Sequence, residues 1–336
     1  MRVAIIGCGN ISKIHIWALQ RTEGVQIAAL ADCDIEKAER MSEKITDSKV
    51  PVYSDYLLML EQIKPDVVHI CTPHFLHVPM AVEALKHNAA VFMEKPPAVS
   101  KEEFEQLKRT AECCQKRIGF CFQNRYNAST AEFDRLLKDR ELGEITGARG
   151  FVTWKREAGY YSDDWHGKIN KEGGGVLINQ SIHTLDLILR YLGEPLKIEA
   201  SMQNHHLKGI TETEDTLEAW MEFEGNKRAS FYATTAYVDD APVILELTFE
   251  KGRAIMIDNM IQIFPKDSEP KIKKCEEQEE GIGKGYWGKG HLACIRDFYH
   301  CLDTSKRYEN DLAGVENTLN TTMRIYESAL KNGGRI

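Results

Sequence analysis

The sequence contains no long apolar run. None of its apolar stretches approaches the ~18 residues that a membrane-spanning helix requires, although the chain has 336 residues. The chain also opens directly into the apolar segment Arg2–Ile6, so we expect no signal peptide. These absences predict a soluble, cytoplasmic protein without a membrane partner.

An excess of basic charge is also absent. The chain carries 43 basic and 51 acidic residues, which gives a formal net charge of −8. A nucleic-acid partner needs a basic surface that can neutralise phosphates. The composition therefore argues against nucleic acid as the main partner.

Cysteine pairs and metal-ligand patterns are missing too. The nine cysteines are an odd number, and no two have Cys-x-x-Cys spacing. Several lie in apolar segments, so we interpret them as reduced core thiols. His205 and His206 are adjacent in a polar turn, and His183 with Asp186 lacks a third ligand at a defined spacing. The sequence therefore predicts no metal site, and it contains no Gly-x-Ser-x-Gly elbow of a serine hydrolase.

The length and the order of elements predict two domains. Hydrophobic residues make up 43% of the chain and charged residues 28%, as in ordinary soluble proteins. Apolar strands alternate with helical patterns up to residue 122, which is typical of a parallel sheet with right-handed crossovers. We expect the strands at 3–6, 25–31, 52–53, 66–71, 89–93 and 118–122. Residues 1–122 should therefore form a doubly wound α/β domain of the Rossmann type.

A glycine turn follows the first strand. The segment Gly7-Cys8-Gly9-Asn10-Ile11-Ser12 precedes a helical pattern that runs through Leu19. The first glycine permits a sharp turn, the second lets the backbone approach a pyrophosphate, and the helix N-terminus offers free N–H groups. Ser12 stands at the third glycine position. The turn predicts dinucleotide binding, and a glycine turn without a ligand is the alternative.

The second strand ends at Asp32. An acidic residue at this place accepts hydrogen bonds from the ribose hydroxyls and repels a 2′-phosphate. Cys33 and Asp34 follow it, without an arginine. We therefore expect NAD rather than NADP. Asp34 is more readily explained as the cap of a helix that begins at Ile35.

The fifth strand ends in Glu94-Lys95-Pro96, where the proline stops it. Ligands of doubly wound sheets bind at the carboxyl ends of the strands. We therefore expect Lys95 beside the ligand. The glycine turn and the segment 179–183 should form two other sides of one site around it.

From Ile145 the pattern changes to strands that alternate apolar and polar residues. We expect strands at 145–155, 197–203, 216–224, 228–237, 243–250, 253–257 and 260–264, with hairpin turns at 225–226 and 251–252. They predict a C-terminal α+β domain, residues 123–336, with a large open, mostly antiparallel sheet. One sheet face should pack on helices and the other on a second subunit. Residues 268–285 are expected to form a loop, and the helices at about 289–303 and 313–331 could pack back on the first domain.

Residues 154–166 form a polar segment that is rich in aromatic side chains. Tyr160 and Trp165 are interleaved with charged residues and with His166. Aromatic faces beside hydrogen-bonding groups suit the mixed surface of a sugar. A buried aromatic patch under a long loop is the alternative.

A glycine run, Gly173-Gly174-Gly175, opens a helix that we expect to continue to Tyr191. Asn179 and His183 are four residues apart and so share one face, and Asp186 lies within reach of His183. A histidine on such a helix is more often a satisfied core residue than a catalyst. The glycine run lets something approach the helix start, however, which favours a functional site.

Together these motifs resemble those of the Gfo/Idh/MocA oxidoreductases, which include glucose-fructose oxidoreductase and inositol dehydrogenase. The resemblance covers nearly the whole chain. It is carried by Gly7-Cys8-Gly9-Asn10-Ile11, Asp32, Cys71-Thr72-Pro73 with His77, Glu94-Lys95-Pro96, Gln123-Asn124-Arg125-Tyr126, Trp165 and the segment 173–186.

The resemblance implies an NAD(P)-dependent dehydrogenase of a sugar, sugar derivative or cyclitol, assembled as a homodimer or homotetramer through the C-terminal sheet. It implies that Lys95 orients the substrate hydroxyl and that His183 is the general base, with Asn179 beside them where many members carry aspartate. The implied cofactor contacts are Gly7, Gly9, Asn10, Ile11, Asp32, Thr72, Pro73, His77, Glu94, Lys95, Asn124 and Trp165. The implied substrate contacts are Lys95, Arg125, Tyr160, His166, Asn179 and His183.

The expected chemistry fits these residue types. Oxidation of a secondary alcohol needs hydride transfer to nicotinamide and loss of a proton, for which histidine is a suitable base. A lysine stabilises the developing alkoxide. Two alternatives stay open: a glycoside hydrolase or lyase that oxidises its sugar transiently with bound NAD, and a non-catalytic NAD-binding sensor.

Overall fold

The chain folds as two compact units. The computed structural model describes residues 1–45, 49–276, 282 and 289–333. Of these, the first unit holds 1–123, 282 and 290–315, and the second holds 124–276, 289 and 316–333. Among the described residues, no helix combines the length and apolar character needed to cross a membrane.

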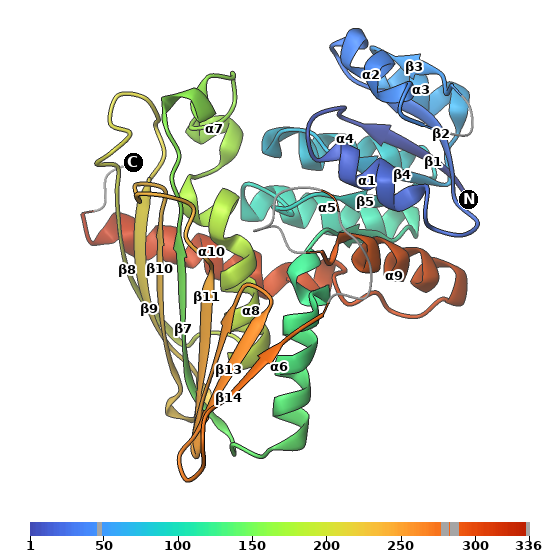
Figure 1. The fold of residues 1–336 in the computed structure, drawn as a ribbon. Coiled ribbons are helices and arrows are strands. Elements are labelled where there is room, and N and C mark those ends of the chain that lie inside the picture. Colours follow the sequence, from blue (N-terminus) through green and yellow to red (C-terminus); the bar gives the residue numbers. More distant parts are fainter. Residues whose placement is uncertain (46–48, 277–281, 283–288, 334–336) are drawn as a thin grey trace. The chain divides into compact units, whose positions relative to one another are not determined.

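The first unit is built on a six-stranded parallel sheet in the order β3-β2-β1-β4-β5-β6 (Figure 1). The strands are β1 (Arg2–Ile6), β2 (Gln26–Ala31), β3 (Val52–Tyr53), β4 (Val67–Ile70), β5 (Ala90–Met93) and β6 (Ile118–Phe120). The order reverses between β1 and β4, which is the place where doubly wound sheets bind ligands. The predicted Rossmann-type sheet is therefore confirmed, with its strands in the predicted places.

Helices cover this sheet and bury its strands. They are α1 (Ser12–Leu19), α2 (Ile35–Ser42), α3 (Tyr56–Ile63), α4 (His77–Lys86), α5 (Lys101–Cys114) and α9 (His291–Thr304). α1 packs against α9, and α4 packs on β4, β5 and α5. All residues of β4 and β5 are buried, because a parallel sheet is covered on both faces. Asp34 caps α2 as predicted, since its carboxylate accepts a hydrogen bond from the N–H of Lys37.

The second unit contains an eight-stranded mixed sheet in the order β14-β13-β12-β11-β7-β10-β9-β8. The strands are β7 (Ile145–Thr153), β8 (Lys197–Gln203), β9 (Thr216–Glu222), β10 (Arg228–Thr234), β11 (Ile244–Phe249), β12 (Gly252–Ile257), β13 (Met260–Pro265) and β14 (Lys271–Lys274). β7 and β10 pair in parallel, and the other neighbours are antiparallel. The predicted open, mostly antiparallel sheet is confirmed.

One prediction in this sheet was wrong. The polar segment 268–285 was expected to be a loop, but Lys271–Lys274 forms the edge strand β14, paired with β13. Its side chains are exposed and three of the four are lysines, so the segment lacks the apolar alternation that marks a strand. Charged residues on an edge strand oppose pairing with further chains. Residues 277–281 and 283–285 of the expected loop lie outside the described residues.

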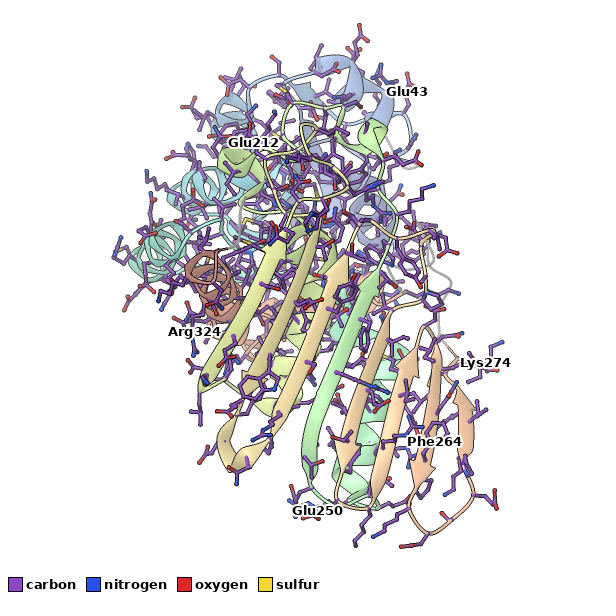
Figure 2. The ribbon with its side chains drawn as sticks, turned by 90° about the vertical axis from the view of Figure 1, so that its left-hand side faces the viewer. Glu43, Glu212, Glu250, Phe264, Lys274 and Arg324 are labelled. Carbon is purple, nitrogen blue, oxygen red and sulfur yellow. The ribbon has the colours of Figure 1, made fainter. Side chains whose placement is uncertain are left out.

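Helices cover one face of the eight-stranded sheet, and Figure 2 looks onto the other face, where the strands lie in front of the helices. The helices are α6 (Ala128–Asp139), α7 (Ile169–Glu172), α8 (Ile182–Leu192) and α10 (Leu312–Lys331), and α10 begins in the first unit. α8 packs on β7 and α6 on β13. A Cβ at Gly150 of β7 would lie 3.0–3.2 Å from side chains of Ile188, Thr184 and Phe231, so the glycine permits this close packing.

The segment before α8 differs from the single α-helix that the sequence predicted. Val176–Ser181 forms a π-helical turn, and α8 begins only at Ile182. The hydroxyl of Ser181 donates to the carbonyls of Val176 and Leu177. A π-turn changes which side chains share a face, so the four-residue spacing of Asn179 and His183 does not by itself align them. Such turns are frequent at functional sites.

The glycine run before this turn is filled by the chain itself. A Cβ at Gly174 would lie 2.1 Å from the hydroxyl of Tyr326, and one at Gly175 would lie 2.0 Å from the carbonyl oxygen of Glu214. The Glu214 carboxylate accepts hydrogen bonds from Gly175 (2.8 Å), Leu177 (3.0 Å) and Tyr326 (2.9 Å). At these two glycines, the expected approach of an external group is replaced by close packing of Glu214 and Tyr326.

Gly175→Ala should therefore destabilise the protein, by about 1–3 kcal/mol if it behaves as other overpacked sites do. The added methyl group has no room beside the Glu214 backbone, whereas at Gly159 nothing lies within 4 Å of an added Cβ. Urea unfolding followed by circular dichroism measures both changes. Equal stabilities of Gly175→Ala and Gly159→Ala would contradict the packing.

Candidate functional site

The first unit brings most of the predicted cofactor residues to one edge of its sheet. They follow the carboxyl ends of four neighbouring strands: Gly7, Gly9, Asn10 and Ile11 after β1, Asp32 after β2, Thr72, Pro73 and His77 after β4, and Glu94 and Lys95 after β5. The parallel register of β1 with β2 and β4, and of β4 with β5, places these ends side by side.

The glycine turn has the shape that a dinucleotide needs. Gly7 has φ +92°, and a Cβ there would lie 2.6 Å from the carbonyl oxygen of Cys71, so only glycine fits. Around Gly9 nothing lies within 4 Å of an added Cβ, so the backbone is open to a ligand. Ser12, which replaces the third glycine, is buried and donates its hydroxyl to the carbonyl of Gly9 at 2.7 Å. The residues present fit the pyrophosphate of NAD.

Asp32 is held firmly at the end of β2. Its Oδ2 accepts the N–H of Cys8 at 2.7 Å, and its Oδ1 accepts the N–H of Asp34 at 2.9 Å. The side chain therefore joins the end of β2 to the glycine turn. A role of this carboxylate toward a ribose stays a prediction.

His77 connects two of the site loops. Its ring is buried, with Nδ1 2.9 Å from the carbonyl oxygen of Pro96 and Nε2 2.9 Å from that of Thr72. Burial lowers the pKa of His77 from its usual value, while these two carbonyls act in the opposite direction. Since both ring nitrogens face the chain, the geometry favours support of the loops over the direct cofactor contact expected from the sequence.

Glu94 ends a buried chain of hydrogen bonds that the sequence reasoning missed. Its Oε1 lies 3.0 Å from Nε2 of His15, whose Nδ1 lies 2.8 Å from Nδ1 of His69; Nε2 of His69 lies 2.9 Å from the hydroxyl of Tyr299. The signal was available, since His69 lies inside an apolar strand. Glu94 also accepts a hydrogen bond from the backbone N–H of Lys95 at 3.3 Å. The chain of hydrogen bonds therefore extends to the backbone of the predicted catalytic lysine.

The same cluster gathers an acid, histidines and a thiol in a buried position. Burial alone would raise the pKa of Glu94, but the hydrogen bond and charge of His15, with His291 and Lys95, hold it below its ordinary range. Donor atoms of His15, Glu94 and Cys121 lie within 4.8 Å of one another. Burial raises the pKa of the Cys121 thiol well above its usual value.

In the second unit, Asn179 is bound to an acidic residue that the sequence reasoning missed. Asn179 lies in the π-turn and is buried, and its Nδ2 donates to Oε1 of Glu172. The hydroxyl of Tyr160 lies 3.4 Å from the same nitrogen. Glu172 is fully buried and also accepts the N–H of Gly167 at 2.5 Å. His183 is half-buried in the first turn of α8.

The aromatic segment before this turn is a group of rings in mutual contact, tilted against one another. His166 lies 3.7 Å from Trp165 and 4.6 Å from Tyr160 between ring centroids, and its Nδ1 lies 2.5 Å from Oδ2 of Asp163. Burial and the nearby charge of Glu172 raise the pKa of Tyr160 to about 12, so its hydroxyl stays protonated. These rings are half-buried rather than fully buried, which leaves them able to contact a ligand.

Asp186 and Arg125 form a buried ion pair. Nε of Arg125 lies 2.7 Å from Oδ2 of Asp186, a second guanidinium nitrogen lies 2.5 Å from Oδ1, and Thr318 donates to Oδ1 at 2.6 Å. Asp186 was expected to support His183, which stays a prediction; the structure shows it bound to Arg125 and Thr318. The backbone carbonyl of Asn124, an expected cofactor contact, accepts a hydrogen bond from the Thr130 hydroxyl at 2.6 Å.

Family models match both halves of the chain. Residues 1–121 match the model described as the oxidoreductase family with an NAD-binding Rossmann fold, GFO_IDH_MocA, and residues 130–255 match the GFO/IDH/MocA C-terminal domain. Together these two matches cover the glycine turn, the Glu94-Lys95-Pro96 strand end and the segment that carries Asn179 and His183.

Among curated proteins, D-glucoside 3-dehydrogenase of Escherichia coli K12 is 29% identical over 254 residues, which are 74% of this chain and 70% of that protein. Inositol 2-dehydrogenase of Arthrobacter sp. FB24 is 31% identical over 43% of each chain. Glycosyl hydrolase family 109 protein 2 of Akkermansia muciniphila is 28% identical over 51% of this chain and 39% of that protein. The chain thus spans less than half the length of the last two.

Solved structures share the fold over nearly the whole chain. An oxidoreductase from Agrobacterium radiobacter in complex with NAD+, L-tartaric acid and magnesium matches with a TM-score of 0.88 at 17% identity, covering 100% of this chain and 98% of that one. The WlbA dehydrogenase of Bordetella pertussis in complex with NADH and UDP-GlcNAcA matches with a TM-score of 0.84 at 24% identity, over 100% and 98%.

The buried cluster of the first unit makes stability depend on pH. Burial lowers the pKa of His291 to about 4, with Glu94 acting to raise it and His15 to lower it. Between its ordinary pKa near 6.5 and pH 4, the unfolded chain binds a proton here that the folded chain does not, so stability falls as pH falls. This group alone should remove about 2 kcal/mol between pH 7.5 and pH 5.

The test is urea unfolding of the wild type, His291→Gln and His205→Gln at both pH values. His205 is exposed and serves as the matched control. The decrease in the free energy of unfolding between pH 7.5 and pH 5 should be smaller in His291→Gln than in the wild type, and unchanged in His205→Gln. A full wild-type loss in His291→Gln would assign the pH dependence to other groups.

Proposed function

Because the chain belongs to the Gfo/Idh/MocA family of NAD-binding oxidoreductases, we propose that it oxidises a secondary hydroxyl of a sugar, sugar derivative or cyclitol. The observation that carries the proposal is the strand end Glu94-Lys95 beside a glycine turn that is open at Gly9 and bound to Asp32. The similarity to D-glucoside 3-dehydrogenase favours a glucoside as the substrate and carbon 3 as the position oxidised.

The residues of the chain take distinct parts in this reaction. Lys95 orients the substrate hydroxyl and stabilises the developing alkoxide, and His183 takes the hydroxyl proton. NAD, when bound, accepts the hydride from the carbinol carbon. The balance is alcohol and NAD+ giving ketone, NADH and one proton. Substrate contacts are proposed for Arg125, Tyr160, His166 and Asn179, and further cofactor contacts for Asn124 and Trp165.

NAD is the proposed cofactor in preference to NADP. The carboxylate of Asp32 is fixed by two backbone N–H groups, so it cannot swing away from a 2′-phosphate without losing both bonds. The carboxylate can accept hydrogen bonds from the ribose hydroxyls, and its negative charge repels the 2′-phosphate of NADP. Cys33 and Asp34 follow it and supply no positive charge.

One specific observation supports a second candidate function. The similarity to a glycosyl hydrolase family 109 protein favours a glycosidase that oxidises its sugar transiently and then returns the hydride. Such an enzyme cleaves a glycoside without net formation of NADH, whereas a dehydrogenase accumulates it.

Absorbance at the NADH band, with glycosides, monosaccharides, cyclitols and nucleotide sugars as substrates, distinguishes the two functions. We expect NADH to accumulate with a glucoside and NAD, and much less NADPH to form with NADP. Cleavage of a glycoside at constant NADH would select the hydrolase. Absence of both changes over the whole panel would refute the proposed activity.

Lys95→Ala and His183→Ala should each lower kcat by at least ~100-fold, because each removes a group that acts on the reacting hydroxyl. NAD binding, followed by tryptophan fluorescence, should persist in His183→Ala. His205→Ala is the matched control, since this histidine is exposed and distant in sequence from the motifs. Unchanged turnover in either of the first two variants would remove that residue from the mechanism.

The chain is proposed to assemble as a homo-oligomer through the open face of the eight-stranded sheet. Phe151 and Tyr232, on adjacent strands β7 and β10, form a ring pair on this face at 6.5 Å. Arg253 lies over the ring of Phe264, which Figure 2 labels, at 4.1 Å. Rings and paired charges on a flat sheet suit an interface between identical copies.

Sedimentation should therefore show a dimer or tetramer at micromolar concentration. Phe151→Lys should shift the protein toward the monomer. It adds one positive charge per subunit to the proposed interface, two in a dimer and four in a tetramer, and these like charges repel each other. Glu224→Lys, in an exposed turn, should leave the assembly intact. A wild-type monomer would contradict the proposal.

A further inference from the structure

Glu172 and Asn179 form a pair in which the acidic residue determines what the amide can bind. Glu172 is fully buried in α7, and Asn179 lies in the π-turn seven residues later. One carboxylate oxygen of Glu172 accepts the N–H of Gly167, and the other accepts from Nδ2 of Asn179. A carboxylate can only accept hydrogen bonds, so the group of Asn179 that faces it must be the NH₂.

Tyr160 reinforces this orientation of the amide. Its hydroxyl oxygen lies 3.4 Å from the same Nδ2 of Asn179. With the NH₂ group turned toward Glu172 and Tyr160, the amide oxygen of Asn179 must point in another direction, because the two atoms diverge from one carbon. The orientation of an amide is normally assigned from such a network, and here the acceptor-only partner decides it.

We propose that Glu172 is a positioning residue that fixes Asn179 as a hydrogen-bond acceptor for a substrate hydroxyl beside the one that His183 deprotonates. This inference rests on the proposed function, in which Asn179 contacts the substrate. Sugars and cyclitols carry several hydroxyls, so an acceptor at this place holds a second hydroxyl of the substrate while His183 takes the proton of the reacting one. Asn179 stands where many members of the family carry aspartate, and the negative charge lies one contact away on Glu172.

Glu172→Gln should reverse the orientation of the Asn179 side-chain amide. The N–H of Gly167 still needs an acceptor, so the new amide oxygen should face Gly167 and its NH₂ should face Asn179. Two NH₂ groups cannot bind each other. Asn179 should therefore turn its oxygen inward and present a donor to the substrate, and kcat/KM for the alcohol should fall about 10- to 100-fold.

Asn179→Asp should lose activity and stability for a different reason. It places two carboxylates within hydrogen-bond distance in a buried position, so they must share a proton. Activity and the thermal unfolding midpoint should both fall, and both losses should be larger at pH 8 than at pH 5.5, where the shared proton is available. A role confined to packing would not generate this pH dependence, because asparagine and aspartate have the same shape.

The double variant Glu172→Gln with Asn179→Asp is the decisive experiment. In it the amide NH₂ at position 172 donates to the carboxylate at position 179, which is the reverse of the wild-type pair. The other carboxylate oxygen at position 179 again faces the substrate. We expect kcat/KM within about tenfold of wild type, above both single variants. Glu214→Gln with Asn179→Asp is the matched control, since Glu214 is a buried acid that binds other backbone groups; it should not restore activity.

The stability measurements keep this inference distinct from the proposed function. If the wild type turns over no substrate, the four thermal unfolding midpoints still report whether residues 172 and 179 are coupled. A double variant more stable at pH 8 than Asn179→Asp supports the pair. Additive losses of stability, or Glu172→Gln with kcat/KM within twofold of wild type, would overturn the assignment.

Discussion

Carboxylates that accept backbone N–H groups hold the functional segments of this chain, and those of Glu172 and Glu214 are buried. Asp32 holds the glycine turn through the N–H of Cys8. Glu214 holds the start of the π-turn, and Glu172 holds both the loop before it and the amide of Asn179. A carboxylate without donors is costly to bury, and a turn without acceptors leaves its N–H groups unsatisfied. The loops and the acids therefore depend on each other.

The glycines near these acids serve two different purposes. At Gly9 the space beside the backbone is open, which suits the approach of a cofactor. At Gly174 and Gly175 the space is occupied by Tyr326 and by the backbone of Glu214. The same residue type therefore marks a ligand surface in the first unit and a packed anchor in the second. Only the surroundings distinguish them.

Much of the fold and part of the candidate site follow from local patterns in the sequence. The alternation of apolar strands with helices predicted the parallel sheet, because both patterns are read within a few residues. The same reasoning missed β14, since its lysines carry no apolar alternation and pairing with β13 alone makes it a strand. It also missed the π-turn, which has the same residue pattern as the α-helix that follows it. Spacing placed Asp186 near His183, and the fold adds a bidentate pair with Arg125 that spacing could not indicate.

The sequence by itself determined the order of the elements, the glycine turn, the acidic end of β2 and the lysine at the end of β5. These depend on apolar periodicity and on the special backbone of glycine and proline, which act over neighbouring residues. Only the tertiary structure decided which acid binds which backbone group. Glu214 accepts the N–H of Gly175, 39 positions away, and Asp32 accepts that of Cys8, 24 positions away. A buried charge takes its partners from whatever the fold places around it, and no local pattern records that choice.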